Sequence, residues 1–363
     1  MIPSLFAVAA VVTTIAGVPG TSGYLDGAAN VALFNKPTEI TLDTASGDVY
    51  VVDRLNSAVR KVSGGAVTTF LQSPALDFGG PINGGVVIEP PGQYPNSPGY
   101  GRGVFIAASG GHIIVQRDIF NSALVHDWPW VGVQDQPGSK DGDVSALPQP
   151  TFNSPTAITV DRRHYANKCC APREVYVADT GNGSIRKITR VINFEAEYFA
   201  HDVTTVARGF VAPRGLAFGP DGSLYVADAG QHAVIRVMPD GTSFVVAGKP
   251  FNPGNADGVP GQLNTPTGID VDDAGNVYIA DTANNIIRRL RADGVLETVA
   301  GAPGEAGFAD GDSLVARFNG PVGIQVAADG KGLIVADTSN HVIRKIAFIP
   351  PPPETPRRRT VRH

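Results

Sequence analysis

Short apolar runs alternate with polar turns along the whole chain, and one such run returns together with the turn that follows it. The run is rich in Val, Ile and Tyr and ends in Asp, as in Val277–Ala280 before Asp281, and an Ile-Arg or Val-Arg pair follows the turn. Four copies place Asp and Arg seven residues apart: Asp53 and Arg60, Asp179 and Arg186, Asp281 and Arg288, Asp337 and Arg344. The recurrence of this whole pattern along the chain predicts a repeat architecture.

Two further copies are less regular. One leads from Asp228 to Arg236, and its spacing is interpreted as one extra residue in the turn. The other runs from Val104 to Gln116, with Ala108 and Val115 where the charged residues are expected. The chain therefore contains six units.

Each unit divides into four short strands. The clearest is Asn264–Gly301, where turn-forming clusters separate the apolar runs Thr267–Val271, Val277–Ala280, Ile286–Arg291 and Val295–Ala300. One four-stranded meander cannot bury both of its faces, so the units are expected to pack face to face and to close into a ring. The sequence predicts an all-β, six-bladed β-propeller of four-stranded antiparallel blades.

The two ends of the array predict how the ring closes. Val11–Gly17 resembles the fourth strand of other units, whereas the last unit stops after its third strand at Ile346–Phe348. The N-terminal strand is therefore expected to complete the last blade. The predicted domains are an apolar lead-in or signal remnant at 1–10, the propeller at 11–349, and a Pro- and Arg-rich tail or linker at 350–363.

Composition agrees with many short strands and limits the partners. Charged residues are 17% of the chain, and it holds 43 Gly and 29 Pro. A net charge of -5 disfavours nucleic acid, which requires clustered Lys and Arg. No apolar run reaches the roughly 20 residues of a membrane-spanning helix. The adjacent Cys169 and Cys170 are left as free thiols, partners of another chain, or a rare vicinal bridge.

These patterns resemble the NHL-repeat β-propellers, whose repeats carry a Pro-x-Gly-Ile start, a Val-Tyr-Val-Ala-Asp strand and an Asn-His-x-Ile-Arg turn. The segment Asp337–Lys345 is very similar to that turn, and the resemblance covers about residues 11–348. The second copy departs from the pattern, because it lacks the Asp and Arg and has a Pro-, Gly- and Tyr-rich insertion at Glu89–Gly103.

The repeated Asp and Arg are interpreted as structural, since a residue present once in every blade is spread around the ring and cannot converge on one substrate. The aspartate is expected to bond the following turn, and the arginine to cover the neighbouring blade. His112, His232 and His341 fall at equivalent positions of different blades, so they are not expected to share a metal ion.

Binding contacts are predicted on loops. Four Gly-rich segments that join blades each contain an Asp-Gly pair, beginning at Asp26, Asp141, Asp257 and Asp310. Further candidates are Tyr94 and Tyr100 in the blade-two insertion and Trp128 and Trp130 in the link to blade three. Asn182 begins a sequence for N-linked glycosylation.

An enzyme is the alternative. Six-bladed lactonases and phosphotriesterases, which this shape resembles, hold calcium with carboxylates and amides of inner strands, and Glu39, Asp270 and Gln325 are the candidates here. An amidating lyase in the NHL family uses histidines for zinc, but no matching histidine set is present. Alternatively, Glu39, Asp270 and Gln325 are polar side chains that solvate a water-filled channel.

The sequence therefore predicts a non-catalytic binding or assembly scaffold, extracellular, that uses its blade-connecting loops. Its expected partner is a protein or a second copy of the chain, with a glycan as another option and no cofactor. The alternative is a calcium- or zinc-dependent hydrolase or lyase with its site at the channel mouth. RNA binding is a third option and would require a basic face.

Overall fold

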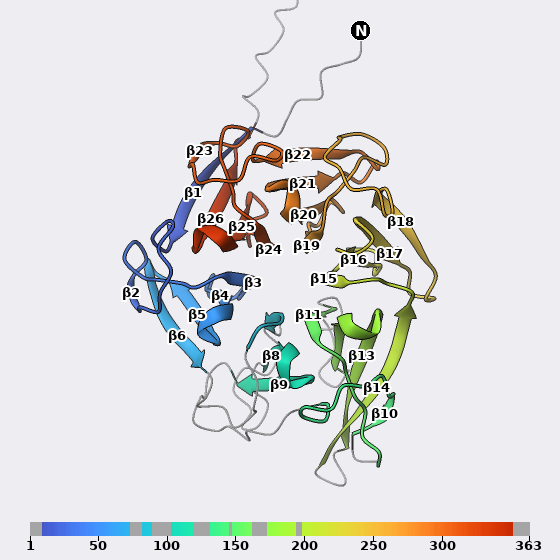
Figure 1. The fold of residues 1–363 in the computed structure, drawn as a ribbon. Helices are drawn as coiled ribbons and strands as arrows, with labels where there is room; N and C mark the ends of the chain where they lie inside the picture. The colour runs from blue at the N-terminus through green and yellow to red at the C-terminus, as the bar shows by residue number, and fades with distance from the viewer. Residues whose placement is uncertain are drawn as a thin grey trace, which may run out of the picture.

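The computed structural model shows six small antiparallel sheets set around a central axis as the blades of a propeller (Figure 1). It describes residues 9–72, 82–88, 103–118, 131–144, 147–161, 173–193 and 198–350. The all-β, six-bladed prediction is confirmed. Within the described residues no helix is long and apolar enough to cross a membrane.

The first three blades are built from the N-terminal half of the chain. Blade one holds β2 (Gly27–Ala28), β3 (Pro37–Leu42), β4 (Val49–Asp53), β5 (Ala58–Ser63) and β6 (Ala66–Gln72). Blade two holds β7 (Val86–Ile88), β8 (Gly103–Ala108) and β9 (Ile113–Asp118) among its described residues. Blade three holds β10 (Gly142–Asp143), β11 (Pro155–Val160), β12 (Arg173–Asp179), β13 (Ser184–Asn193) and β14 (Tyr198–Arg208).

The other three blades complete the ring. Blade four holds β15 (Pro213–Phe218), β16 (Leu224–Asp228), β17 (Ala233–Val237) and β18 (Ser243–Gly248). Blade five holds β19 (Pro266–Val271), β20 (Val277–Asp281), β21 (Ile286–Leu290) and β22 (Leu296–Ala300). Blade six holds β23 (Gly311–Asp312), β24 (Pro321–Val326), β25 (Gly332–Asp337), β26 (Val342–Phe348) and β1 (Ala10–Ala16).

The N-terminal strand closes the ring as predicted. β1 pairs antiparallel with β26, with Val12 opposite Ile346, so the two ends of the described chain meet in blade six (Figure 1). The core lies between neighbouring blades: Tyr278 of blade five, for example, belongs to one buried cluster with Ile324 and Val335 of blade six. This packing buries the apolar faces of both sheets.

The innermost strands approach one another closely around the axis. A Cβ added at Gly268 of β19 would lie 2.2 Å from the Val322 carbonyl oxygen of the next blade, and one at Gly323 of β24 would lie 2.2 Å from that of Thr38. Only glycine fits such an approach. In blade one the same register position holds Glu39 instead, as the pairing of Ile40 with Val51 shows.

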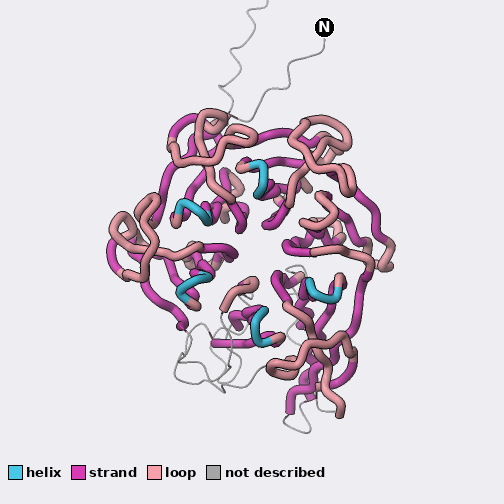
Figure 2. The backbone as a smooth tube through the Cα atoms, in the orientation of Figure 1, coloured by secondary structure: helices cyan, strands magenta, loops and turns pink. Residues whose placement is uncertain are grey.

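A 3-10 turn follows the second strand in five blades, at Arg54–Asn56, Ser109–Gly111, Thr180–Asn182, Thr282–Asn284 and Thr338–Asn340. Figure 2 shows these turns arranged around the ring beside the long loops. In four blades a backbone N–H of the turn donates to a loop carbonyl, as Leu55 does to Asn35. We call this side of the ring, which carries the turns and the inter-blade loops, the loop face.

Blade four corrects one prediction. Asp228 pairs with Ala233, five residues on, as Asp53 pairs with Ala58, so the turn contains no extra residue. Ile235, opposite Val226, occupies the position of the repeat arginine, and Arg236 is the next residue along the strand. The spacing of eight was misread because an apolar residue stands in the arginine position.

Candidate functional site

In five of the six blades the second strand ends in an aspartate that ties the entering loop to the turn. In blade five, Asp281 accepts the backbone N–H of Asn264 at 2.7 Å and the side-chain N–H of Asn284 at 2.8 Å. The equivalent Asp53, Asp179 and Asp337 make the same two kinds of bond, and all four carboxylates are fully buried. The predicted bond between aspartate and turn is present in these blades.

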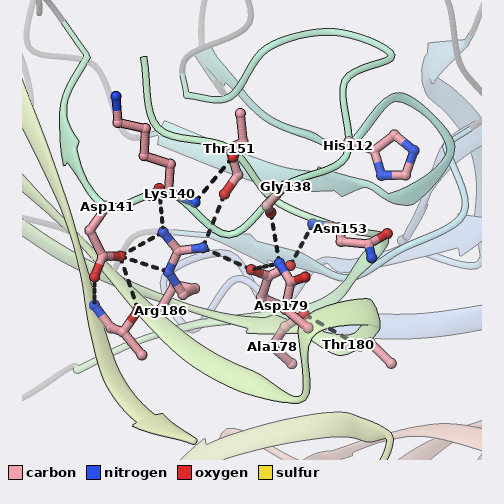
Figure 3. Close-up of polar contacts among 12 residues, drawn as sticks. His112, Gly138, Lys140, Asp141, Thr151, Asn153, Ala178, Asp179, Thr180 and Arg186 are labelled. Atoms are coloured by element: carbon pink, nitrogen blue, oxygen red, sulfur yellow. Dashed lines mark hydrogen bonds and ion pairs between the residues drawn. The ribbon is translucent and has the colours of Figure 1, made fainter. Parts of the chain in front are cut away.

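Seven residues after this aspartate stands a fully buried arginine that binds two carboxylates. Arg186 donates through Nη1 to Asp179 at 2.8 Å and through Nη2 to Asp141, in the loop, at 2.6 Å (Figure 3). It also donates to the backbone carbonyls of Thr151 and Lys140. Arg60, Arg288 and Arg344 make the corresponding pairs with Asp53 and Asp26, Asp281 and Asp257, and Asp337 and Asp310.

Aromatic rings of the loop lie beside three of these guanidinium groups, those of Arg60, Arg186 and Arg344. The guanidinium carbon of Arg344 lies 4.7 Å from the ring centre of Phe308 and 4.9 Å from that of Phe318. Arg60 lies in the same way beside Tyr24 and Phe34. Cation–π contact adds to the charged hydrogen bonds, so each loop has an arginine as its anchor.

Burial and hydrogen bonding pull the carboxyl pKa values in opposite directions. Burial raises the pKa of Asp281 and of Asp337 to about 6, although the N–H groups and arginine that each binds act to lower it. Partial burial also acts to raise the pKa of Asp26, but the N–H of Thr69 and the guanidinium of Arg60 outweigh it and hold that pKa below its usual range. Asp26, Asp281 and Asp337 therefore carry charge at neutral pH.

The loop aspartates had been assigned to binding, and the structure places them in the anchor. Asp26, Asp141 and Asp310 also accept the N–H of a threonine on the outermost strand, and Asp257 accepts the hydroxyl of Thr298. The glycine after each aspartate pairs with that same strand, as Gly27 does with Val67. A sequence signal exists: the four units with Asp-Gly loops are the four with Asp and Arg seven apart.

Blade four lacks this anchor. Arg236 is ion-paired with Asp221 rather than with Asp228. Asp228 instead accepts backbone N–H groups, including those of Val211 at 2.8 Å and Ala212 at 2.9 Å. Asp228 and Arg236 are therefore engaged in two separate interactions.

The three aligned histidines join neighbouring blades. The Nδ1 atoms of His112, His232 and His341 accept the backbone N–H of Ser154, Thr265 and Lys36, at 3.0, 3.0 and 3.1 Å. In blade five, Asn285 does this through its side-chain oxygen, which accepts the N–H of Gly320. Burial, together with the positive charge of Lys36, lowers the pKa of His341. This inter-blade role was missed by sequence reasoning.

The outer surface of the loops is both apolar and acidic. Phe251, Val259 and Val315 are 69%, 73% and 63% exposed. Phe251 has a backbone φ of 60°, a left-handed conformation that bulky residues rarely adopt. Half-exposed carboxylates of the anchor, such as Asp257, and the exposed Glu305 lie on the same loops.

The candidate glycosylation residue has a structural place. Both side-chain N–H groups of Asn182 are donated, to the carbonyl of Gly138 at 2.7 Å and to Asp179 at 2.8 Å (Figure 3). Asn56, Asn284 and Asn340 do the same in their blades. A glycan on this nitrogen would remove one of these bonds, so the folded geometry argues against modification there.

The three candidate metal ligands line one pocket. Glu39, Asp270 and Gln325 project into a channel cavity of about 190 Å³ between the innermost strands. Asp270 accepts the side-chain N–H of Gln325 and, at 2.7 Å, the backbone N–H of Val326. Glu39 makes no hydrogen bond or ion pair with the described residues, and burial raises its pKa to about 7.

Within the described residues, no group of three or more His, Cys, Asp and Glu side chains is placed to hold a metal ion. Gln325 has committed an N–H to Asp270, which is bonded from two sides. Tyr94, Tyr100, Trp128, Trp130 and the Cys169–Cys170 pair lie outside the described residues.

Comparison with known proteins finds an NHL repeat in this ring and similarity to NHL-repeat proteins. The NHL repeat matches residues 263–290, which span the first three strands of blade five. The chloroplastic protein SUPPRESSOR OF QUENCHING 1 of Arabidopsis thaliana is 31% identical over 194 residues, which cover 48% of this chain and 18% of that protein. NHL repeat-containing protein 2 of Bos taurus is 33% identical over 150 residues, covering 38% and 21%. The match therefore spans about a fifth of these relatives.

Solved structures share the fold. An auxiliary nutrient binding protein from Bacteroides thetaiotaomicron has a TM-score of 0.62 at 18% identity, covering 93% of this chain and 76% of its own. A gluconolactonase from Xanthomonas campestris has a TM-score of 0.54 at 14% identity, covering 94% and 90%. The class of protein is thus a six-bladed β-propeller. The chain contains a segment that matches the NHL repeat and is similar to NHL-repeat proteins, which confirms the resemblance seen in its repeats.

Proposed function

We propose that this propeller is a non-catalytic binding module that recognises a protein partner with its loop face. The support is the anchor: in four blades a buried arginine fixes an inter-blade loop through two carboxylates, and in three of them an aromatic ring lies beside the guanidinium group. Loops fixed before binding lose little conformational entropy when a partner docks. Their outer apolar side chains then remain available for contact.

Phe251 is the residue that supports this proposal most directly. It is a large aromatic side chain, 69% exposed, on a backbone conformation that costs energy for any residue with a Cβ. The backbone conformation serves the fold, because the Phe251 N–H donates to the carbonyl oxygen of Gln231 at 3.0 Å. Exposure of the aromatic ring does not stabilise the isolated fold, whereas aromatic anchors contribute strongly at interfaces. The half-exposed carboxylates of the same loops favour a partner that offers basic and apolar side chains.

The test compares one loop-face variant with one channel variant. Phe251→Asn relieves the backbone strain, since Asn tolerates this conformation, and removes the aromatic side chain. We expect it to fold at least as stably as the wild type and to lose a protein captured by the wild type from extracts of the source cells. The captured protein is then purified and its affinity for both forms measured by calorimetry.

The matched control is Glu39→Gln in the channel, which is expected to keep the captured protein. Equal affinity of the wild type and Phe251→Asn for that protein would contradict the loop-face proposal. The location outside the cell that the sequence predicts belongs to this proposal, and fractionation of the source cells tests it. A glycan partner would be retained on the protein after protease treatment of the extract.

A second candidate function is the binding or turnover of a small molecule in the channel. It is favoured by Glu39, a carboxyl group with a raised pKa and no partner among the described residues, in a cavity lined by inner strands. The shared fold with a gluconolactonase is compatible with this option. Calcium titration followed by calorimetry tests it: heat of binding that disappears in Glu39→Gln would favour the channel over the loop face.

A further inference from the structure

We infer that β18, the outermost strand of blade four, is an open edge that pairs with the β18 of a second copy of this chain. This inference does not depend on the proposed function of the loop face. β18 ends its sheet, and no described residue pairs with its outer side along Ser243–Val246. Figure 1 shows it running along the rim of the ring, with no added strand outside it.

The other blades show what is missing. In blades one, three and six a short strand that begins at the glycine of the Asp-Gly pair (β2, β10 or β23) pairs antiparallel with the outermost strand. The aspartate stands just before this strand. This aspartate also accepts a threonine N–H of the outermost strand, at 2.9 Å from Thr69, 3.1 Å from Thr205 and 3.0 Å from Thr14. In blade five a single bridge from Gly258 to Leu296 covers the same place.

Blade four has lost every part of this cover. The chain passes from β14 to β15 through only Gly209–Ala212, so no Asp-Gly segment precedes it. Val245 stands where the others have threonine, as its pairing with Ile235 shows, and no described carboxylate receives its N–H. An uncovered edge with unpaired backbone groups is a template for another strand.

The side chains of β18 favour self-pairing. Phe244 is 48% exposed and Val245 is 39% exposed, and the strand Ser243–Gly248 contains no charged residue. Proteins commonly place charges or proline on exposed edges to prevent such pairing, and β18 has neither. Two identical apolar edges can satisfy each other's backbone groups around a two-fold axis.

Charge at the two ends of β18 supports a second copy rather than an unrelated strand. The exposed Asp240 precedes the strand and the exposed Lys249 follows it. Antiparallel pairing of two copies brings the Asp240 end of one strand beside the Lys249 end of the other. The edge is therefore complementary to itself in charge as well as in hydrogen bonding.

The experiment measures the mass of the full chain in solution by sedimentation across a range of concentrations. We expect the wild type to form a dimer and Val245→Lys to shift the monomer–dimer equilibrium at least about tenfold toward monomer, since the added charge opposes edge pairing. Thr68→Lys is the control: it places the same charge at an exposed position on β6, which β2 already covers, and should leave the dimer unchanged.

Hydrogen exchange gives a second measurement that does not require a variant. Backbone amides of Ser243–Val246 should become protected as concentration rises, while those of β6 stay constant. A wild type that is monomeric throughout would overturn the inference. So would a dimer that Val245→Lys leaves intact while the amides of β18 exchange at the same rate at every concentration.

Discussion

Ile235 lies opposite Val245 in blade four, at the register where blades one, three, five and six place an arginine opposite a threonine. The exchange of both residues coincides with the loss of the Asp-Gly loop. The arginine, the loop aspartate and the threonine depend on one another. The arginine is ion-paired with the aspartate, and the threonine donates a hydrogen bond to the same aspartate. A blade therefore keeps the anchor as a unit or replaces it with apolar side chains as a unit, because a buried charge without its partners is costly.

The buried arginine is expected to contribute strongly to stability. Replacing Arg288 with methionine leaves the fully buried Asp281 without its charged partner. We expect Arg288→Met to lower the free energy of unfolding by about 3–5 kcal/mol. Urea denaturation followed by fluorescence measures it. The control is Arg291→Met, whose pair with Asp293 is exposed and should be worth less than about 1 kcal/mol. Equal effects of the two substitutions would contradict this account.

The loop carboxylate is expected to act locally. Asp310→Asn weakens the bond to the buried Arg344 and the acceptor for the N–H of Thr14. Because Asp310 is partly exposed, we expect a loss of only about 1 kcal/mol in global stability. Hydrogen exchange should show faster opening of residues 301–320, with the strands of blade five unaffected. Glu305→Gln, at an exposed pair with Arg317, is the control and should leave that exchange unchanged. Loss of protection throughout the ring would argue against a local anchor.

The ring and its closure were predictable because the apolar run of each strand recurs in every unit of the sequence. The match of Val11–Gly17 to other fourth strands was enough to place β1 beside β26. The strand-end aspartates and their arginines were also recognisable as structural, since they recur once in each regular blade. The strands and the Asp–Arg spacing can both be recognised from residues close together in the sequence.

Features that depend on contacts between distant segments were not predictable in the same way. Asp257 and Arg288 are 31 residues apart, and the only sequence signal that connects them is that Asp-Gly loops and the seven-residue Asp–Arg spacing occur in the same four units. In blade four, the arginine at 236 suggested a longer turn, whereas strand pairing shows Ile235 in the repeat position. The channel residues Glu39, Asp270 and Gln325 line one pocket, and the bond between Asp270 and Gln325 depends on the approach of two blades.

Because of His341, we expect the folded protein to become less stable in acid. Its Nδ1 atom accepts the N–H of Lys36 from blade one, which requires the neutral ring. Its pKa is lowered from 6.5 in the folded protein, so below that value the unfolded chain binds protons more readily and stability falls as the pH falls. In His341→Asn the pH dependence should be weaker, because Asn285 already serves this role in blade five.

The reciprocal variant Asn285→His provides the control for His341. It places a titrating ring at the junction of blades five and six and should steepen the loss of stability in acid. Thermal unfolding of the three proteins between about pH 7 and about pH 5 makes the comparison. Identical pH profiles for wild type and His341→Asn would show that this inter-blade bond does not titrate.

Because of Glu39, we expect the opposite dependence of stability on pH. Burial raises its pKa from 4.5 to about 7, so between these values the folded protein binds more protons than the unfolded chain does. The contribution of the neutral group to stability is present below about pH 4.5 and is lost as the pH rises through 7. Glu39→Gln, which cannot ionise, should be more stable than the wild type by up to about 3 kcal/mol above neutral pH.

The same comparison should shrink in acid, because the wild-type carboxyl is then protonated and resembles the amide. Urea denaturation of both proteins at about pH 5 and about pH 8 measures the difference, and water in the channel will reduce it by solvating the charge. Glu305→Gln, a substitution at an exposed carboxylate, should change stability equally at both pH values. Parallel curves for Glu39→Gln and the wild type would mean that Glu39 is as well solvated in the channel as it is in the unfolded chain, and the basis for a channel site would be lost.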